Sequence, residues 1–161
     1  MNIKFVIPLI LVLLSTISCQ LSIKDNSMAE IISKKKLLDL VSNLRAKGCD
    51  CGGTNMPQVK RLEWNYELER AATAHSIDMN VQNYFSHVSL DGASFSDRIN
   101  GTEYLGNPGG ENIAYGYGSE EDVFNAWRNS PGHCMNMMNG GFKDIAVGRS
   151  GTYWTMVFGK K

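Results

Sequence analysis

Apolar residues recur at helical spacing in two long stretches of the chain. In the first, 37–44, they fall on one face, and Gly48 follows as a natural residue for the C′ position. In the second, 68–79, they follow Asn65, which is a good N-cap. The pattern therefore predicts two amphipathic helices, one ending at Gly48 and one running from Asn65 to about residue 83.

A third main helix is predicted after Ser119, which is another good N-cap. Phe124 and Trp127 belong to its buried stripe, and Pro131 is expected to end it. A shorter helix is expected to begin within 94–99, capped by one of its serines, and a helical turn is expected at 133–139.

The end of the chain has the pattern of a β-hairpin. Two strand-like runs, 145–149 and 152–158, are joined by Ser150 and Gly151, a good pair for a tight turn. A further short strand is expected within 111–117. Helices thus flank few strands, and the expected fold class is α+β with a layered, sandwich-like arrangement.

The N-terminus has the composition of an export signal. The apolar run 5–14 is too short to span a bilayer as a mature helix, and small polar residues lead from it to Cys19. This ending resembles a bacterial lipoprotein signal, in which the cysteine becomes the lipidated first residue; a plain secretory signal with an incidental cysteine is the alternative. We therefore expect an export signal at 1–18, a lipidated Cys19 with a polar tether at 19–33, and one domain at 34–161.

Charge argues against one class of partner. Lysine and arginine together number 16, as do aspartate and glutamate, and no basic stripe exists beyond Lys34, Lys35 and Lys36. Nucleic-acid-binding domains normally carry a basic excess on one face. We therefore expect no nucleic-acid partner.

The cysteines suggest a single bridge. If Cys19 is lipidated, Cys49, Cys51 and Cys134 remain, and export places them in an oxidising compartment. Cys49 and Cys51 are too close in sequence for an easy bridge. A bridge from either one to Cys134 would close a long loop and stabilise the fold by roughly 3–5 kcal/mol.

His87, Glu111 and His133 are the candidate functional residues. Each lies in a loop or at the end of a predicted element, where functional groups tend to be displayed. Two imidazoles and a carboxylate suit a divalent cation such as zinc, or an acid–base pair. Spacing alone also allows ordinary surface or structural histidines. His75, on the apolar face of the second helix, is interpreted as a core histidine.

Several sequence pieces, in order, resemble the CAP superfamily (cysteine-rich secretory proteins, antigen 5 and plant pathogenesis-related proteins) in its bacterial, SCP-domain form. The resemblance covers most of 37–159. It implies a three-layer α-β-α sandwich with a central, mainly antiparallel sheet and a large cleft, which in many members holds two histidines and two acids. The pieces are LEWNYELERAATAHSIDM, FSHVSLDG, SDRI, GGENIAYGYG, AWRNSPGHCMNMM and YWTMVFG.

The resemblance assigns His87, Glu111 and His133 to this cleft, through the H-x-S-x-D-G, GENIA and SPGH pieces respectively. The position of the second acid is Ser130 here, so one carboxylate is missing. The implied site is a two-histidine metal site of His87 and His133, with Glu111 orienting a histidine or a water. Zinc or another divalent cation is the one cofactor expected.

The same resemblance implies a disulfide between Cys51 and Cys134 beside the cleft, which leaves Cys49 as the odd thiol. A Cys49–Cys134 bridge is the near alternative.

Together these features imply a lipid-anchored, non-catalytic binding module at the bacterial outer membrane or cell surface. The expected partners are the membrane, through Cys19, and a host or envelope protein or a small apolar ligand such as a sterol or fatty acid. The alternative is a metal-dependent hydrolase or protease that uses the histidine and glutamate cleft. We favour binding because a zinc hydrolase normally has three protein ligands and an open position.

Overall fold

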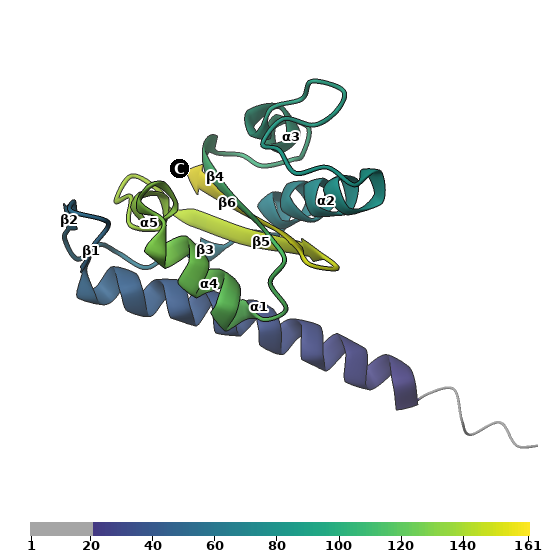
Figure 1. Cartoon of the computed structure of the whole chain (residues 1–161), viewed down its shortest axis with the longest axis horizontal. Coiled ribbons are helices and arrows are strands. Elements are labelled where there is room, and N and C mark those ends of the chain that lie inside the picture. The colour runs from purple at the N-terminus through teal and green to yellow at the C-terminus, as the bar shows by residue number, and fades with distance from the viewer. Residues whose placement is uncertain (1–20) are drawn as a thin grey trace, which may run out of the picture.

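The computed structural model describes the backbone of residues 21–161 and the side chains of residues 34–161 (Figure 1). The predicted export signal and Cys19 lie outside the described residues. Within the described part, none of the helices combines the length and apolar character that crossing a membrane requires.

The first helix, α1, spans Leu21–Lys47. Its end is where the pattern predicts it, because Gly48 adopts a φ of +70°, which glycine tolerates without strain. Its beginning differs from the expectation, since the helix includes 21–33, a stretch with no sustained apolar period. Extending a helix costs far less than nucleating one. The packed half after residue 33 can therefore carry the helix into this stretch, and the tether role of 19–33 stays a prediction.

Capping residues begin the other helices close to the predicted positions. The Asn65 side chain accepts hydrogen bonds from two backbone N–H groups of the first turn, and the hydroxyls of Ser94 and Ser119 each accept one, from the residue three positions later. Pro131 ends one helix as predicted and also begins the next. The helices are α2 (Tyr66–Gln82), α3 (Phe95–Asn100), α4 (Glu120–Asn129) and α5 (Pro131–Met137).

A four-stranded sheet forms the centre, in the order β3-β5-β6-β4. The predicted hairpin is β5 (Asp144–Ser150) with β6 (Tyr153–Lys160), and β4 (Asn107–Tyr115) pairs antiparallel with β6. Only β3 (Glu63–Trp64) runs parallel to its neighbour, β5. The sheet is therefore mainly antiparallel, as expected. A separate two-stranded ribbon joins β1 (Cys49–Asp50) to β2 (Asn55–Met56).

Helices cover both faces of the sheet (Figure 1), and alternate residues of the hairpin pack against the two helical layers. Ala146 and Val157 pack in one cluster with the apolar face of α2, whereas Val147 and Met156 pack in another with α1, α4 and α5. The α2 layer lies very close, because a Cβ on Gly148 would come within 2.2 Å of the Thr73 backbone nitrogen. The three-layer α-β-α sandwich is thus confirmed.

Candidate functional site

Glu111 is the buried centre of the candidate site. Its side chain is 1% exposed on β4 and has a partner at each oxygen. The Nδ1 of His87 lies 2.8 Å from Oε1, and a guanidinium nitrogen of Arg98 lies 2.7 Å from Oε2. A buried carboxylate is costly unless it is paired and hydrogen-bonded. Arg98 and His87 together satisfy this requirement.

Arg98 also fixes the loop that carries His87. From α3, its guanidinium donates to the backbone oxygens of His87 and Ala93, at 3.1 and 3.0 Å, and to the hydroxyl of Ser89 at 3.1 Å. A carboxylate only accepts, so the Nδ1 of His87 carries the proton in this pair. The Nε2 of a neutral His87 is then left as an acceptor that can bind a ligand.

His133 lies in the first turn of α5, which two asparagines join to β4. Asn112 donates to the backbone oxygen of His133 at 3.0 Å, and Asn136 donates to the backbone oxygen of Glu111 at 3.2 Å. The two amides also bond to each other at 2.9 Å. Burial lowers the pKa of His133, with a smaller contribution from His87.

The fourth predicted cleft position, Ser130, is the junction between α4 and α5. Its backbone N–H bonds to the oxygen of Trp127 and its own oxygen accepts from Cys134, while its side chain makes no capping bond. A hydroxyl group cannot replace a carboxylate as a base. Of the predicted cleft residues, the structure brings Glu111 into contact with His87. Both carboxylate oxygens of Glu111 already have hydrogen-bond partners, so neither is free to act as a base.

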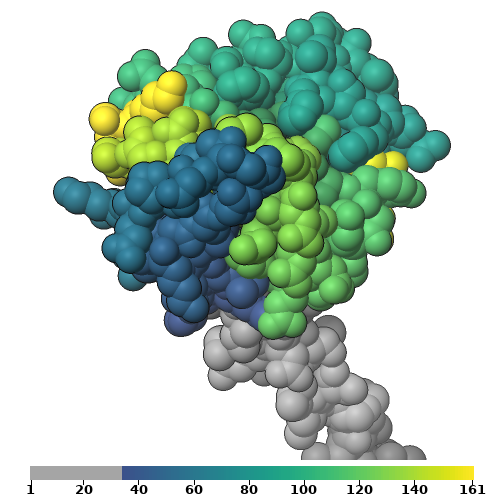
Figure 2. Space-filling model, turned by 60° about the vertical axis from the view of Figure 1, so that its left-hand side comes forward, coloured from purple at the N-terminus to yellow at the C-terminus, as the bar shows by residue number. Residues whose placement is uncertain are grey.

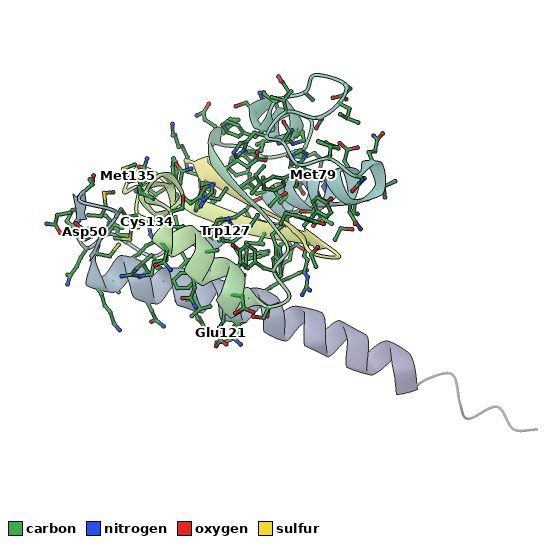
Figure 3. The ribbon with its side chains drawn as sticks, viewed as in Figure 1. Asp50, Met79, Glu121, Trp127, Cys134 and Met135 are labelled. Carbon is green, nitrogen blue, oxygen red and sulfur yellow. A yellow bond between two sulfur atoms is a disulfide. The ribbon has the colours of Figure 1, made fainter. Side chains whose placement is uncertain are left out.

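A disulfide joins Cys51 to Cys134, with a Cα–Cα distance of 5.6 Å, and this is the pairing that the family resemblance implies. Figure 2 shows the loop after α1 packed against the α4–α5 segment, and Figure 3 places Cys134 beside the loop that carries Asp50. Cys49 is the free cysteine of the described residues. The bridge anchors the residue next to His133.

His75 is the core histidine that the sequence predicts. It is 1% exposed, and its Nε2 lies 2.9 Å from the backbone oxygen of Ser86. Burial lowers its pKa, with a further contribution from Arg98. By holding Ser86, it helps to place the neighbouring His87.

A small pocket opens between α2 and the loop that follows it. Its volume is about 250 Å³, and its polar lining includes His75, Asp78 and Arg98. The end of α2 and this loop expose several apolar side chains, namely Ile77, Val81, Phe85, Val88 and Leu90.

The two predicted metal ligands, His87 and His133, do not form a three-ligand group with Glu111. Among residues 34–161, the one group of three or more histidine, cysteine or acidic ligand atoms within 4.8 Å of one another is Cys49, Cys51 and Cys134. Glu111 is engaged by Arg98 and His87, so among the three residues only the imidazoles still offer a donor atom to a cation. Imidazole nitrogen is a common zinc ligand in proteins.

Sequence reasoning missed Arg98 and Asn136. Arg98 lies 13 positions before Glu111, and Asn136 lies 25 positions after it, so no local spacing connects them. The one available signal is that a buried acid needs a cationic partner. It does not say which arginine or lysine supplies the charge.

The model of the cysteine-rich secretory protein family (CAP) matches residues 38–158. "Uncharacterized membrane protein YlbC" of Bacillus subtilis (strain 168) is 34% identical over 129 residues, which is 80% of this chain and 35% of that protein. The chain thus spans about a third of the length of that relative.

Two solved structures are also similar. An extracellular protein containing a SCP domain from Bacillus anthracis str. Ames has a TM-score of 0.72 and 27% identity, covering 81% of this chain and 41% of that one. An outer surface protein from Borrelia burgdorferi has a TM-score of 0.64 and 24% identity, covering 84% of this chain and 93% of that one, and shows the shared fold alone. The matched family model, the shared sandwich and the placement of the motif residues establish that this chain belongs to the cysteine-rich secretory protein (CAP) family.

Proposed function

We propose that this chain is an exported, lipid-anchored binding module of the bacterial surface, and that its cleft binds a divalent cation through His87 and His133 without catalysing a reaction. The observation that carries this proposal is the engagement of both Glu111 oxygens, by His87 at 2.8 Å and by Arg98 at 2.7 Å.

This arrangement suits ligand binding better than acid–base work. A carboxylate that accepts from Nδ1 fixes the tautomer and ring orientation of a metal-binding histidine and strengthens its other nitrogen as a ligand. Here Glu111 has that relation to His87. His133 would supply the second nitrogen ligand. Zinc suits such imidazole donors.

The alternative is a metal-dependent hydrolase or protease in the same cleft. Such an enzyme needs a base to activate water. Glu111 is already held by a guanidinium, and Ser130 replaces the second acid. These features favour binding over catalysis.

Zinc should bind the oxidised protein in a way that depends on both cleft histidines. We expect isothermal titration to give one site per chain, with affinity reduced at least about tenfold by His87→Ala or His133→Ala, since each removes a ligand. The disulfide is kept intact, so that the cysteines do not compete. The control is Lys35→Ala, which changes an exposed side chain of α1 that pairs with Asp39 and not with the site, and it should leave zinc affinity unaltered.

No zinc binding, or binding that survives both cleft substitutions, would contradict the metal proposal. Zinc-dependent hydrolysis of a peptide that is lost in His87→Ala would favour the hydrolase instead.

Export and anchoring are proposed from the N-terminal pattern that ends at Cys19. The relatives described above as extracellular and as a membrane protein support export. Through the anchor, the domain would meet a host or envelope protein at the cell surface.

Metabolic labelling with a fatty acid should mark the wild-type protein and leave Cys19→Ala unlabelled, because the substitution removes the acylated thiol. A Cys49→Ala variant serves as the control and should be labelled like wild type. Equal labelling of wild type and Cys19→Ala would refute the anchor.

A sterol or fatty acid remains the second proposed ligand. The exposed apolar residues on α2 and the following loop favour it. The adjoining pocket of about 250 Å³ is below the roughly 300–1,000 Å³ typical of drug-sized ligands. Such a ligand would therefore lie partly on the surface, and the titration with a fatty acid in place of zinc tests for it.

A further inference from the structure

We propose that Cys49, Cys51 and Cys134 are a second metal site, separate from the histidine cleft. In this proposal the three sulfurs bind one thiophilic divalent cation, such as Zn²⁺ or Cd²⁺, once a dithiol has reduced the Cys51–Cys134 bridge.

The spacing of the sulfurs carries the proposal. The Sγ of Cys49 lies 3.7 Å from the Sγ of Cys51 and 3.7 Å from that of Cys134. Zn–S bonds of about 2.3 Å in a tetrahedral site place two sulfurs about 3.8 Å apart. Two edges of the sulfur triangle thus already have the length that a bound zinc ion requires. The third edge is the disulfide, which has only to open to a similar separation.

The backbone holds the three cysteines in place from two directions. Cys49 and Cys51 flank Asp50 at β1, which pairs with β2, and the N–H of Cys51 bonds to the oxygen of Thr54 at 2.8 Å. Cys134 comes from α5 and belongs to the main core cluster. The ribbon and α5 are thus supported by contacts other than the bridge itself.

The three cysteines differ in their exposure to solvent. Cys51 and Cys134 are 1% and 0% exposed, while Cys49 is only partly buried. A cation would therefore enter past Cys49, and the buried pair would close the opposite side of the site to water. The fourth coordination position would be left for a water molecule or an incoming ligand.

One cation acts on the proposed site, because the positive charge of Arg128 interacts with the Cys49 sulfur. Three thiolates around a divalent cation leave one net negative charge. The guanidinium of Arg128 is the nearby positive charge that would balance it.

The chemistry balances with a dithiol as the reductant. The dithiol gives two electrons and two protons, its own sulfurs form a disulfide, and Cys51 and Cys134 become thiols. On binding the cation, the three thiols release three protons to solvent. The disulfide form of the dithiol can take back the two electrons and two protons and re-form the Cys51–Cys134 bridge, which would remove two ligands and release the metal. Occupancy would therefore follow the redox state.

The test uses the full chain with Cys19→Ala in every sample, so that three thiols remain. Protein reduced by a dithiol, and then freed of it without oxygen, is titrated with Cd²⁺ while the thiolate-to-cadmium charge-transfer absorbance is recorded. We expect one ion per reduced chain and no such absorbance from the oxidised chain. Cys49→Ser and Cys134→Ser should each weaken binding by at least about tenfold. The adjacent Asp50→Asn, which removes no sulfur, should not.

Several outcomes would overturn the proposal. Wild-type affinity in Cys134→Ser would show that the Cys49-Asp50-Cys51 segment alone binds cadmium. An equal signal from the oxidised chain would place the site elsewhere. If the reduced chain loses its near-ultraviolet circular dichroism and Cd²⁺ does not restore it, the folded site does not exist. The histidine cleft gives no thiolate absorbance, so these results do not depend on the zinc proposal.

Discussion

Arg98→Met is expected to lower the free energy of unfolding by about 3–5 kcal/mol, because it leaves the buried Glu111 carboxylate without its cationic partner. The side chains of Arg98 and Glu111 are 11% and 1% exposed, so water cannot replace the lost charge. Methionine keeps much of the apolar volume of the arginine stem and isolates the charge. Urea unfolding of the variant and the wild type measures the difference.

A double variant separates the ion pair from packing. Arg98→Met with Glu111→Gln removes both charges and should recover part of the lost stability, since no unpaired charge remains buried. If Arg98→Met costs less than about 1 kcal/mol, or if the second change brings no recovery, the pair does not hold the site in the way described.

Cys134→Ser is expected to cost about 3–5 kcal/mol, because it removes a bridge whose half-cystines are 83 positions apart. This substitution is chosen over Cys51→Ser because it also removes the alternative pairing with Cys49. Thermal or urea unfolding without reductant measures the loss. In reductant the difference from wild type should nearly vanish.

Cys49→Ser is the matched control for the bridge. It removes a thiol from the same cluster but no covalent bond, and the partly buried position should make it cost less than about 1 kcal/mol. A loss in Cys49→Ser as large as that in Cys134→Ser would mean that the bridge in solution includes Cys49.

Local signals in the sequence account for most of the helix ends. Asn65 and Ser119 begin helices through hydrogen bonds made within one turn, and Gly48 ends one through its positive φ. These features depend on neighbours in the chain, so they can be predicted without the fold. The hairpin at Ser150 and Gly151 is local in the same sense.

Non-local pairing explains what the sequence did not predict. The strand β4 begins at Asn107, although Asn107–Gly110 has the composition of a turn, because β6 pairs with it. Likewise β3 is only two residues long and exists through its parallel pairing with β5. The pairing partner is far along the chain in both cases, and no local period reports it.

The residues of the candidate site also fall into a group found from local motifs and a group that depends on the fold. His87, Glu111 and His133 were found through their motifs and their resemblance to a known family. Arg98 and Asn136, which hold those groups in place, were not. Their roles arise only when α3, α5 and β4 meet in the folded chain.

Anomalous diffraction at the zinc edge, from crystals of the oxidised protein soaked in zinc, would show whether the two histidines bind the metal. We expect one peak bonded to the Nε2 of His87 and to His133, with Glu111 still paired to the Nδ1 of His87 and to Arg98. A peak ligated directly by Glu111 after it has left Arg98, or no peak near either histidine, would contradict this expectation.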